Sequence, residues 1–158
     1  MSNITFGSKH RADSWGFACS VFHSGKNVGD GSPRIDDRVA YRLLQPLIID
    51  KEKLLRIRCG LIVNAGPEAP HPPHIDQPGI EHYTQLYYLT ESDAVTNVFE
   101  EYGNDPKYAD YKPEDFTVKF QCKPEPNKMF IFDGYHWHSS SHVNGNEMRL
   151  VLSINYAK

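Results

Sequence analysis

Apolar and polar residues alternate in short runs along most of the chain, which is the periodicity of β-strands that bury one face. The longer runs are GFACSVF (16–22), LLRIRCGLIVN (54–64), YTQLYYLT (83–90) and MRLVLSINY (148–156). The shorter runs are TNVF (96–99), TVKFQC (117–122) and KMFIF (128–132). Turn signals separate several of them, at PEPN (124–127), Asp133–Gly134 and Asn144–Gly145.

One segment has helical spacing instead. Within residues 35–48, Val39, Leu43 and Leu47 recur four residues apart, and acidic residues occupy the first turn, where the helix dipole favours them. Pro46 has no amide hydrogen and is expected to end or kink this helix.

A helix followed by about seven or eight short strands, about 8–12 residues apart, is typical of a β-sandwich or jelly roll rather than of a parallel α/β sheet. The 158 residues are one domain's worth of chain, and neither a repeat nor a linker divides them. We therefore expect a single mainly β domain over 1–158. Residues 1–52 would hold an irregular segment and the helix, and 53–158 the β core.

Composition excludes some classes of protein. The net charge is -3 and no run of lysine and arginine stands out, which argues against nucleic acid as a partner. No apolar run has the length of a membrane span, and the N-terminus has no secretory pattern. The three cysteines, Cys19, Cys59 and Cys122, are far apart and form no CxxC motif. A cytoplasmic, reducing location is the expectation.

Two histidine-rich stretches carry the candidate chemistry. In HPPHIDQPG, His74 and Asp76 are two residues apart, so on an extended backbone their side chains point the same way. About 60 residues later, FDGYHWHSSSH holds His136, His138 and His142. One of these histidines would complete a facial triad of two histidines and a carboxylate, the ligand set of non-haem Fe(II) oxygenases. Strand parity alone does not choose between His136 and His138.

A basic residue on the last predicted strand extends this pattern. Arg149 lies in a run whose other core-facing positions are apolar or small, and no acidic residue follows it in that strand. An arginine inside a barrel is costly unless it is paired, and a bound dicarboxylate would pair with it. The alternative is that Arg149 points outward into solvent.

With these residues in place, the chain resembles the Fe(II)- and 2-oxoglutarate-dependent dioxygenases, and most of all their prolyl-hydroxylase-like branch. The resemblance covers about residues 53–157 through HIDQPG, YTQLYYLT, KMFIFDG, His138 and RLVLSINY. It implies a double-stranded β-helix, or jelly roll, buttressed by the N-terminal helix. It also implies hydroxylation of a C–H bond in a prolyl residue, a peptide or an amino acid, while 2-oxoglutarate and O₂ become succinate and CO₂.

The resemblance assigns roles residue by residue. It makes His74, Asp76 and His138 the iron ligands, His138 because the family's ligand follows the FDG glycine by about four residues. Arg149 would bind the distal carboxylate of 2-oxoglutarate and Tyr88 would donate a hydrogen bond to it. Asn64 matches a position that often faces the co-substrate, although other residues are usual there. Thr84 shares strand parity with Tyr88 and could line the same pocket.

Other polar residues have weaker assignments. His136, Trp137 and His82 are possible substrate contacts, although Trp137 fits a cap on the barrel mouth better, and exposure is the simpler expectation for His82 and for His71. Residues 91–115 carry eight acidic residues against two lysines. They are interpreted as a solvated excursion with packing aromatics rather than as a lid over the site.

Two other classes of function remain. A cupin-like metal protein could use the same His/Asp/His set for a redox-neutral reaction or for binding, and a barrel that has lost catalysis could serve as a binding module. Arg149 separates the first class from an oxygenase, because only the oxygenase needs an anchor for a dicarboxylate.

Overall fold

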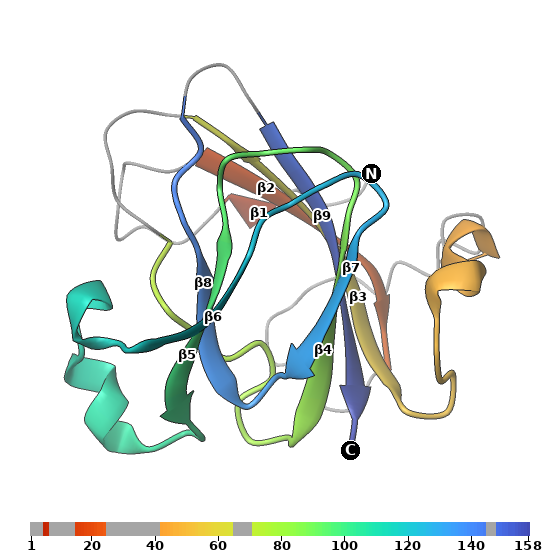
Figure 1. The fold of residues 1–158 in the computed structure, drawn as a ribbon. Coiled ribbons are helices and arrows are strands. Elements are labelled where there is room, and N and C mark those ends of the chain that lie inside the picture. Colours follow the sequence, from red (N-terminus) through yellow and green to blue (C-terminus); the bar gives the residue numbers. More distant parts are fainter. Residues whose placement is uncertain (1–4, 7–14, 25–41, 65–70, 145–147) are drawn as a thin grey trace.

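The computed structural model describes residues 5–6, 15–24, 42–64, 71–144 and 148–158. Two antiparallel sheets face each other, with six strands in the order β1-β2-β3-β9-β4-β7 and three in the order β6-β5-β8 (Figure 1). The strands are β1 (Thr5–Phe6), β2 (Trp15–His23), β3 (Leu54–Val63), β4 (His82–Tyr88), β5 (Thr96–Tyr102), β6 (Val118–Cys122), β7 (Met129–Asp133), β8 (His136–Ser140) and β9 (Met148–Ala157). The arrangement is consistent with a jelly roll, and each predicted strand is present.

Strand β9 lies at the centre of the larger sheet, where it pairs with both β3 and β4. In this register Arg56 lies opposite Asn155, and Asn155 lies opposite Thr84 on the other side. Because side chains alternate between faces, these three polar residues project from the same face of the sheet. The larger sheet therefore presents a row of polar groups where an ordinary sandwich would be apolar.

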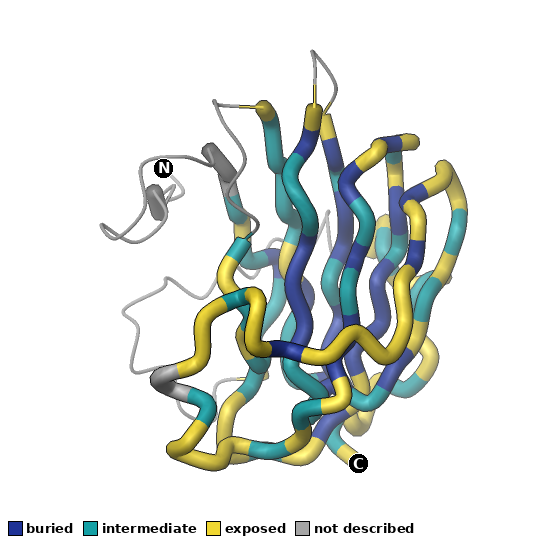
Figure 2. Tube along the Cα trace, turned by 60° about the vertical axis from the view of Figure 1, so that its left-hand side comes forward, coloured by how far each residue is buried: buried dark blue, intermediate teal, exposed yellow. Residues whose placement is uncertain are grey.

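Two apolar clusters cover the two faces of the larger sheet. The first lies between the sheets and is formed by Leu86, Tyr88, Val98, Cys122, Phe132 and Val151. The second covers the outer face of the larger sheet and is formed by Val21, Leu54, Ile57, Ile154 and Tyr156. Figure 2 shows the resulting pattern, with buried positions alternating with more exposed ones along the strands.

Only the C-terminal part of the predicted N-terminal helix lies within the described residues, and this part is short. Among the described residues it is a single turn at 42–44 that continues into a 3-10 turn at Gln45–Leu47. Pro46 lies inside this 3-10 turn, where its missing amide hydrogen prevents further α-helical bonding. Leu44, Leu47 and Ile48 pack against the second cluster, so this short element still covers the sheet. Residues 35–41 of the predicted helix, and Gly145 of the predicted turn, lie outside the described residues.

Within the described chain, the helices are too short to cross a membrane. The acidic excursion after β5 contains the 3-10 turns η2 (Pro106–Asp110) and η3 (Pro113–Asp115). An aromatic cluster attaches it to the smaller sheet, with ring centroids 5.1–6.3 Å apart among Phe99, Tyr108, Tyr111, Phe116 and Trp137. These packing aromatics agree with the interpretation of the excursion as a structural element.

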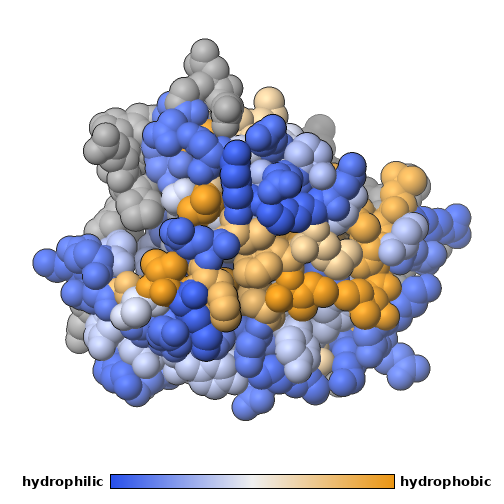
Figure 3. All heavy atoms as spheres, viewed as in Figure 1, coloured by the Kyte–Doolittle hydropathy of each residue, from blue (hydrophilic) through white to orange (hydrophobic). Residues whose placement is uncertain are grey.

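Strand β6, at one edge of the smaller sheet, and strand β7, at one edge of the larger sheet, carry exposed apolar side chains. These are Val118, Phe120, Met129 and Ile131. Figure 3 shows apolar side chains gathered in a band across the middle of the molecule in the view of Figure 1, with hydrophilic residues above and below.

Two isoleucines on the larger sheet test the packing argument. Ile154 is fully buried in the second cluster, whereas Ile131 on β7 is 47% exposed. Ile154→Ala is expected to lower the free energy of unfolding by about 2–5 kcal/mol, because it removes buried methylene groups and leaves a cavity. Ile131→Ala should change it by less than about 1 kcal/mol. Urea unfolding followed by circular dichroism measures both, and equal losses would contradict the assigned packing.

Candidate metal centre

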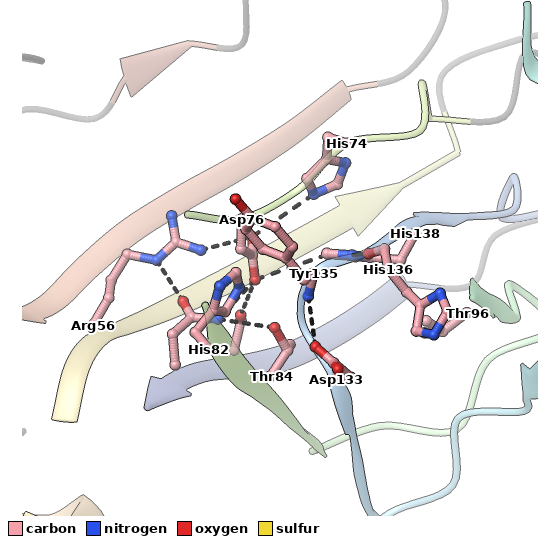
Figure 4. A network of polar contacts seen from close by, with 12 residues as sticks. Arg56, His74, Asp76, His82, Thr84, Thr96, Asp133, Tyr135, His136 and His138 are labelled. Carbon is pink, nitrogen blue, oxygen red and sulfur yellow. Dashed lines mark hydrogen bonds and ion pairs between the residues drawn. The ribbon is translucent and has the colours of Figure 1, made fainter. Parts of the chain in front are cut away.

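The fold brings His74, Asp76 and His138 together between the sheets (Figure 4). His74 lies in the segment that follows residues 65–70 and forms an isolated antiparallel bridge with His138 on β8. Each of the two histidines donates its amide hydrogen to the other's carbonyl oxygen, with both N–O distances 3.0 Å. This backbone pair fixes the two imidazoles side by side, with ring centroids 4.6 Å apart.

The three side chains offer ligand atoms that converge. One donor atom from each lies within 4.8 Å of the others. The Nε2 atom of His74 is 3.7 Å from Oδ1 of Asp76, and the Nε2 atom of His138 is 3.9 Å from Oδ2 of Asp76. Among the described residues this is the cluster with metal-ligand geometry, and neither His136 nor His142 belongs to it.

Backbone contacts set the tautomers of both histidines. Nδ1 of His74 is 3.2 Å from the carbonyl oxygen of Pro72, and Nδ1 of His138 is 3.1 Å from that of His136. A carbonyl only accepts, so each Nδ1 carries the proton and each Nε2 presents its lone pair to the centre. A second hydrogen bond of this kind is what commonly orients metal-binding histidines.

A polar network holds Asp76 in place. The carboxylate accepts hydrogen bonds at 3.0 Å from Ser153 and from Asn155 of β9, and Nη2 of Arg56 lies 2.6 Å from its Oδ1 as an ion pair. Asn155 also binds the neighbouring groups, since its amide donates to Thr84 and its carbonyl accepts from Nε of Arg56. The inner faces of β3, β4 and β9 therefore act together to position one carboxylate.

Electrostatics keeps this carboxylate ionised. Burial alone would raise the pKa of Asp76, but Arg56 above all, then His138 and His74 and the hydrogen bond from Asn155, hold that pKa well below its ordinary value. Burial lowers the pKa of His138 to about 4, and proximity to His74 acts in the same direction. At neutral pH the site therefore offers an anionic carboxylate and a neutral imidazole, which are the protonation states that bind a metal ion.

Exposure differs across the triad. The side chain of His74 is 50% exposed, whereas those of Asp76 and His138 are 7–8% exposed. The site is therefore reached from the side of His74. Two imidazoles and one carboxylate suit Fe(II) or a similar divalent ion and leave coordination positions for other ligands. The donor types, tautomers and charges of these residues thus fit such an ion.

A second polar site lies beyond the triad on β9. Arg149 is 3% exposed, and its Nη2 donates to the hydroxyl of Thr96 at 2.6 Å. The hydroxyl of Tyr88 lies 2.8 Å from the same Thr96 oxygen, and the Arg149 guanidinium lies over the Tyr88 ring. No carboxylate of the described residues pairs with Arg149, and its Nε has no hydrogen-bond partner among them. The interpretation of Arg149 as outward-facing is thereby excluded.

Sequence reasoning missed Ser153 and Asn155, which bind Asp76, and it also missed Thr96 and Arg56. Thr96 lies at the start of a predicted strand and shows its role only through the register of β5. Arg56 was seen only as a polar position in an alternating run, and the run does not reveal which face is inward. Both residues stand on the inner faces of the sheets, where a polar side chain needs a partner.

Three other predicted site residues have clear positions. Thr84 is fully buried and accepts from Asn155, which places it beside Asp76 rather than beside Arg149. Asn64 is exposed and directly follows the last residue of β3. His82 is fully buried, with Nδ1 2.7 Å from the carbonyl oxygen of Ile80, so the expectation that it is exposed was wrong.

The neighbours of His138 contact other elements. The turn after β7 is Gly134–Tyr135, and His136 is the first residue of β8. Its ring packs on Tyr102 and its Nε2 lies 3.4 Å from Nζ of Lys119. The pairing of β5 with β8 is irregular beside His136, because extra residues of β5 lie between Val98, opposite His138, and Tyr102, opposite His136. Trp137 donates to the carbonyl oxygen of Gly103 and packs in the aromatic cluster of the excursion.

Gly134 shows why the FDG turn needs a glycine. A Cβ atom at this position would collide with the imidazole of His82 and the hydroxyl of Thr84. The turn therefore approaches the Asp76 network closely, and any side chain there would push it away.

Comparisons with solved structures find proteins of a similar fold. The chain matches an oxidoreductase of the 2OG-Fe(II) oxygenase family from Burkholderia pseudomallei with a TM-score of 0.57 and 13% identity, over 98% of this chain and 72% of that one. It matches ycfD of E. coli with a TM-score of 0.57 and 11% identity, over 91% of this chain and 34% of that one. It matches the non-heme alpha ketoglutarate dependent epimerase SnoN from nogalamycin biosynthesis with a TM-score of 0.53 and 16% identity, over 67% of this chain and 47% of that one.

At these identities the likeness shows a shared fold, and this chain spans less than half of SnoN and of ycfD. No family model and no curated protein sequence matches the chain. The class that the structure defines is therefore a fold similar to that of Fe(II)/2-oxoglutarate oxygenases, carrying a His-Asp-His triad.

The assignment of His138 can be tested with a metal alone. His138→Ala removes one of three donors and is expected to weaken Mn(II) binding at least about 100-fold, measured by isothermal titration calorimetry. His142→Ala is the matched control and should bind Mn(II) as the unchanged protein does, because His142 is no part of the triad. Loss of binding in His136→Ala, with His138→Ala unaffected, would show that the ligand register is wrong by two residues.

Proposed function

We propose that the protein is a non-haem Fe(II)- and 2-oxoglutarate-dependent oxygenase. The observation that carries this proposal is a pair of sites between the same two sheets. One is the His74–Asp76–His138 triad, and the other is a buried arginine, Arg149, that no described carboxylate neutralises. A dicarboxylate that binds a metal at one end and an arginine at the other matches both sites.

The chain's own residues have separate tasks in this proposal. His74, Asp76 and His138 would hold Fe(II), and the bound ion would supply the activation of O₂. Arg149 and Tyr88, positioned by Thr96, would bind the distal carboxylate of 2-oxoglutarate. Arg56, Ser153 and Asn155 keep the Asp76 carboxylate oriented and ionised. Leu86, Phe132 and Val151, from β4, β7 and β9, belong to the same buried cluster as Tyr88 and make this part of the interior apolar.

The finer proposal is hydroxylation of a C–H bond in a prolyl residue, a peptide or an amino acid, with release of succinate and CO₂. It is supported by the resemblance of HIDQPG, KMFIFDG and RLVLSINY to the prolyl-hydroxylase-like branch. A cupin-like binding protein would need the triad alone, and it gives no reason for a buried arginine without an acidic partner.

The anchor at Arg149 gives the direct test. Anaerobic addition of Fe(II) and then 2-oxoglutarate is expected to produce a metal-to-ligand charge-transfer band in visible light. Arg149→Ala should weaken 2-oxoglutarate binding about 10- to 100-fold, because it removes a charged hydrogen-bond donor, and should leave Fe(II) affinity unchanged.

Arg42→Ala is the matched control, since Arg42 is exposed on the short N-terminal helix. It should leave both affinities unchanged. Absence of the band in the unchanged protein would refute the oxygenase proposal. Unchanged 2-oxoglutarate affinity in Arg149→Ala would refute the anchor.

A further inference from the structure

His71 precedes His74 by three residues across two prolines, and its structural position differs from the exposed loop position that the sequence suggested. The residue is partly buried, and its Nε2 is shielded from solvent with no hydrogen-bond partner among the described residues. An imidazole nitrogen in this state costs free energy unless a ligand binds it.

A backbone hydrogen bond places His71 beside the smaller sheet. Its amide donates to the carbonyl oxygen of Ser140 at 3.1 Å, and Ser140 pairs with Thr96 on β5. Thr96 is the residue whose hydroxyl contacts both Arg149 and Tyr88. His71 therefore belongs to the row of the sheet that carries the arginine site.

The metal triad occupies the next row of this sheet. His74 bridges to His138, and His138 pairs with Val98 on β5, two residues along from the row of Thr96 and Ser140. Two residues of a strand advance about 6.6 Å, which is comparable to the length of a five-carbon dicarboxylate. A co-substrate bound to the triad would thus reach the row of His71 with its far end.

Arg149 adds a second unsatisfied atom in the same place. Its Nε is buried and, within the described chain, has no acceptor. The pKa of His71 is lowered to about 4, mainly by burial. The nearby positive charge of Arg149 is the next largest cause, and His74 and His142 act in the same direction. His71 is therefore neutral at pH 7 and can donate a single hydrogen bond from one ring nitrogen.

We infer that His71 is a co-substrate-binding residue, which donates a hydrogen bond from Nε2 to the distal carboxylate of 2-oxoglutarate beside Arg149 and Tyr88. This inference rests on the proposed function. One carboxylate has enough lone pairs to accept from all three side chains, and it would satisfy the buried Nε atom of Arg149 as well.

The test compares two ligands in three variants. The ligands are 2-oxoglutarate and 2-oxopentanoate, which has the same carbon chain with a methyl group in place of the distal carboxylate. Calorimetry on the Mn(II)-loaded protein gives each dissociation constant. His71→Phe should weaken 2-oxoglutarate binding about 10- to 100-fold and leave 2-oxopentanoate binding unchanged, because only the first ligand has the carboxylate.

Two further variants separate this contact from a structural role. His71→Gln keeps an N–H donor at about the same reach and should restore most of the 2-oxoglutarate affinity. His142→Phe removes the neighbouring imidazole and should change neither constant. Thermal melts confirm that each variant is folded.

Each other outcome contradicts the inference in its own way. Equal losses for both ligands in His71→Phe would show that the residue only supports the fold, and no loss would show that it makes no contact. If the unchanged protein binds neither ligand, the proposed oxygenase function fails together with this inference. If it binds both equally, no distal carboxylate contact exists.

Discussion

The rest of the site depends on the ion pair and hydrogen bonds that the Asp76 carboxylate makes inside the protein. A buried anion is costly unless charges and donors surround it, and here Arg56, Ser153 and Asn155 do so. These partners come from β3 and β9, whereas His138 comes from the opposite sheet. Asp76 thus lies between residues of both sheets, and the polar residues on the inner face of the larger sheet bind its carboxylate.

The smaller sheet supplies the spacing between the two ends of the site. One row carries His74 and His138, and the next carries His71 and Thr96, so the backbone ladder sets the separation of the metal and carboxylate ends. Sites built on paired strands hold their geometry better than sites on loops. His74 and Asp76 lie outside the regular strands, on a segment that the bridge between His74 and His138 attaches to β8.

Much of this arrangement was predictable from local sequence. Alternation located the strands, and the spacing of His74 and Asp76 predicted that these two side chains point the same way. The choice of His138 over His136 came from the resemblance to the dioxygenase family. Thr96, Arg56 and His71 were not predicted, because their roles depend on which residues face each other across strands far apart in the chain. His82 was predicted as exposed because its loop is polar, whereas a backbone carbonyl and the close approach of Gly134 bury it. The described part of the helix changes to a 3-10 turn at Pro46, as expected from the missing amide hydrogen of proline.

The central position of β9 has a consequence for the order of folding. This strand follows the other eight described strands in the chain, yet it lies between β3 and β4 and joins them into one sheet. Until β9 is synthesised, β3 and β4 have no ladder between them, and the carboxylate of Asp76 lacks Ser153 and Asn155. Pairings between such distant segments form slowly, because a long loop must close before any contact stabilises it. The metal centre is therefore among the last parts of the molecule to form.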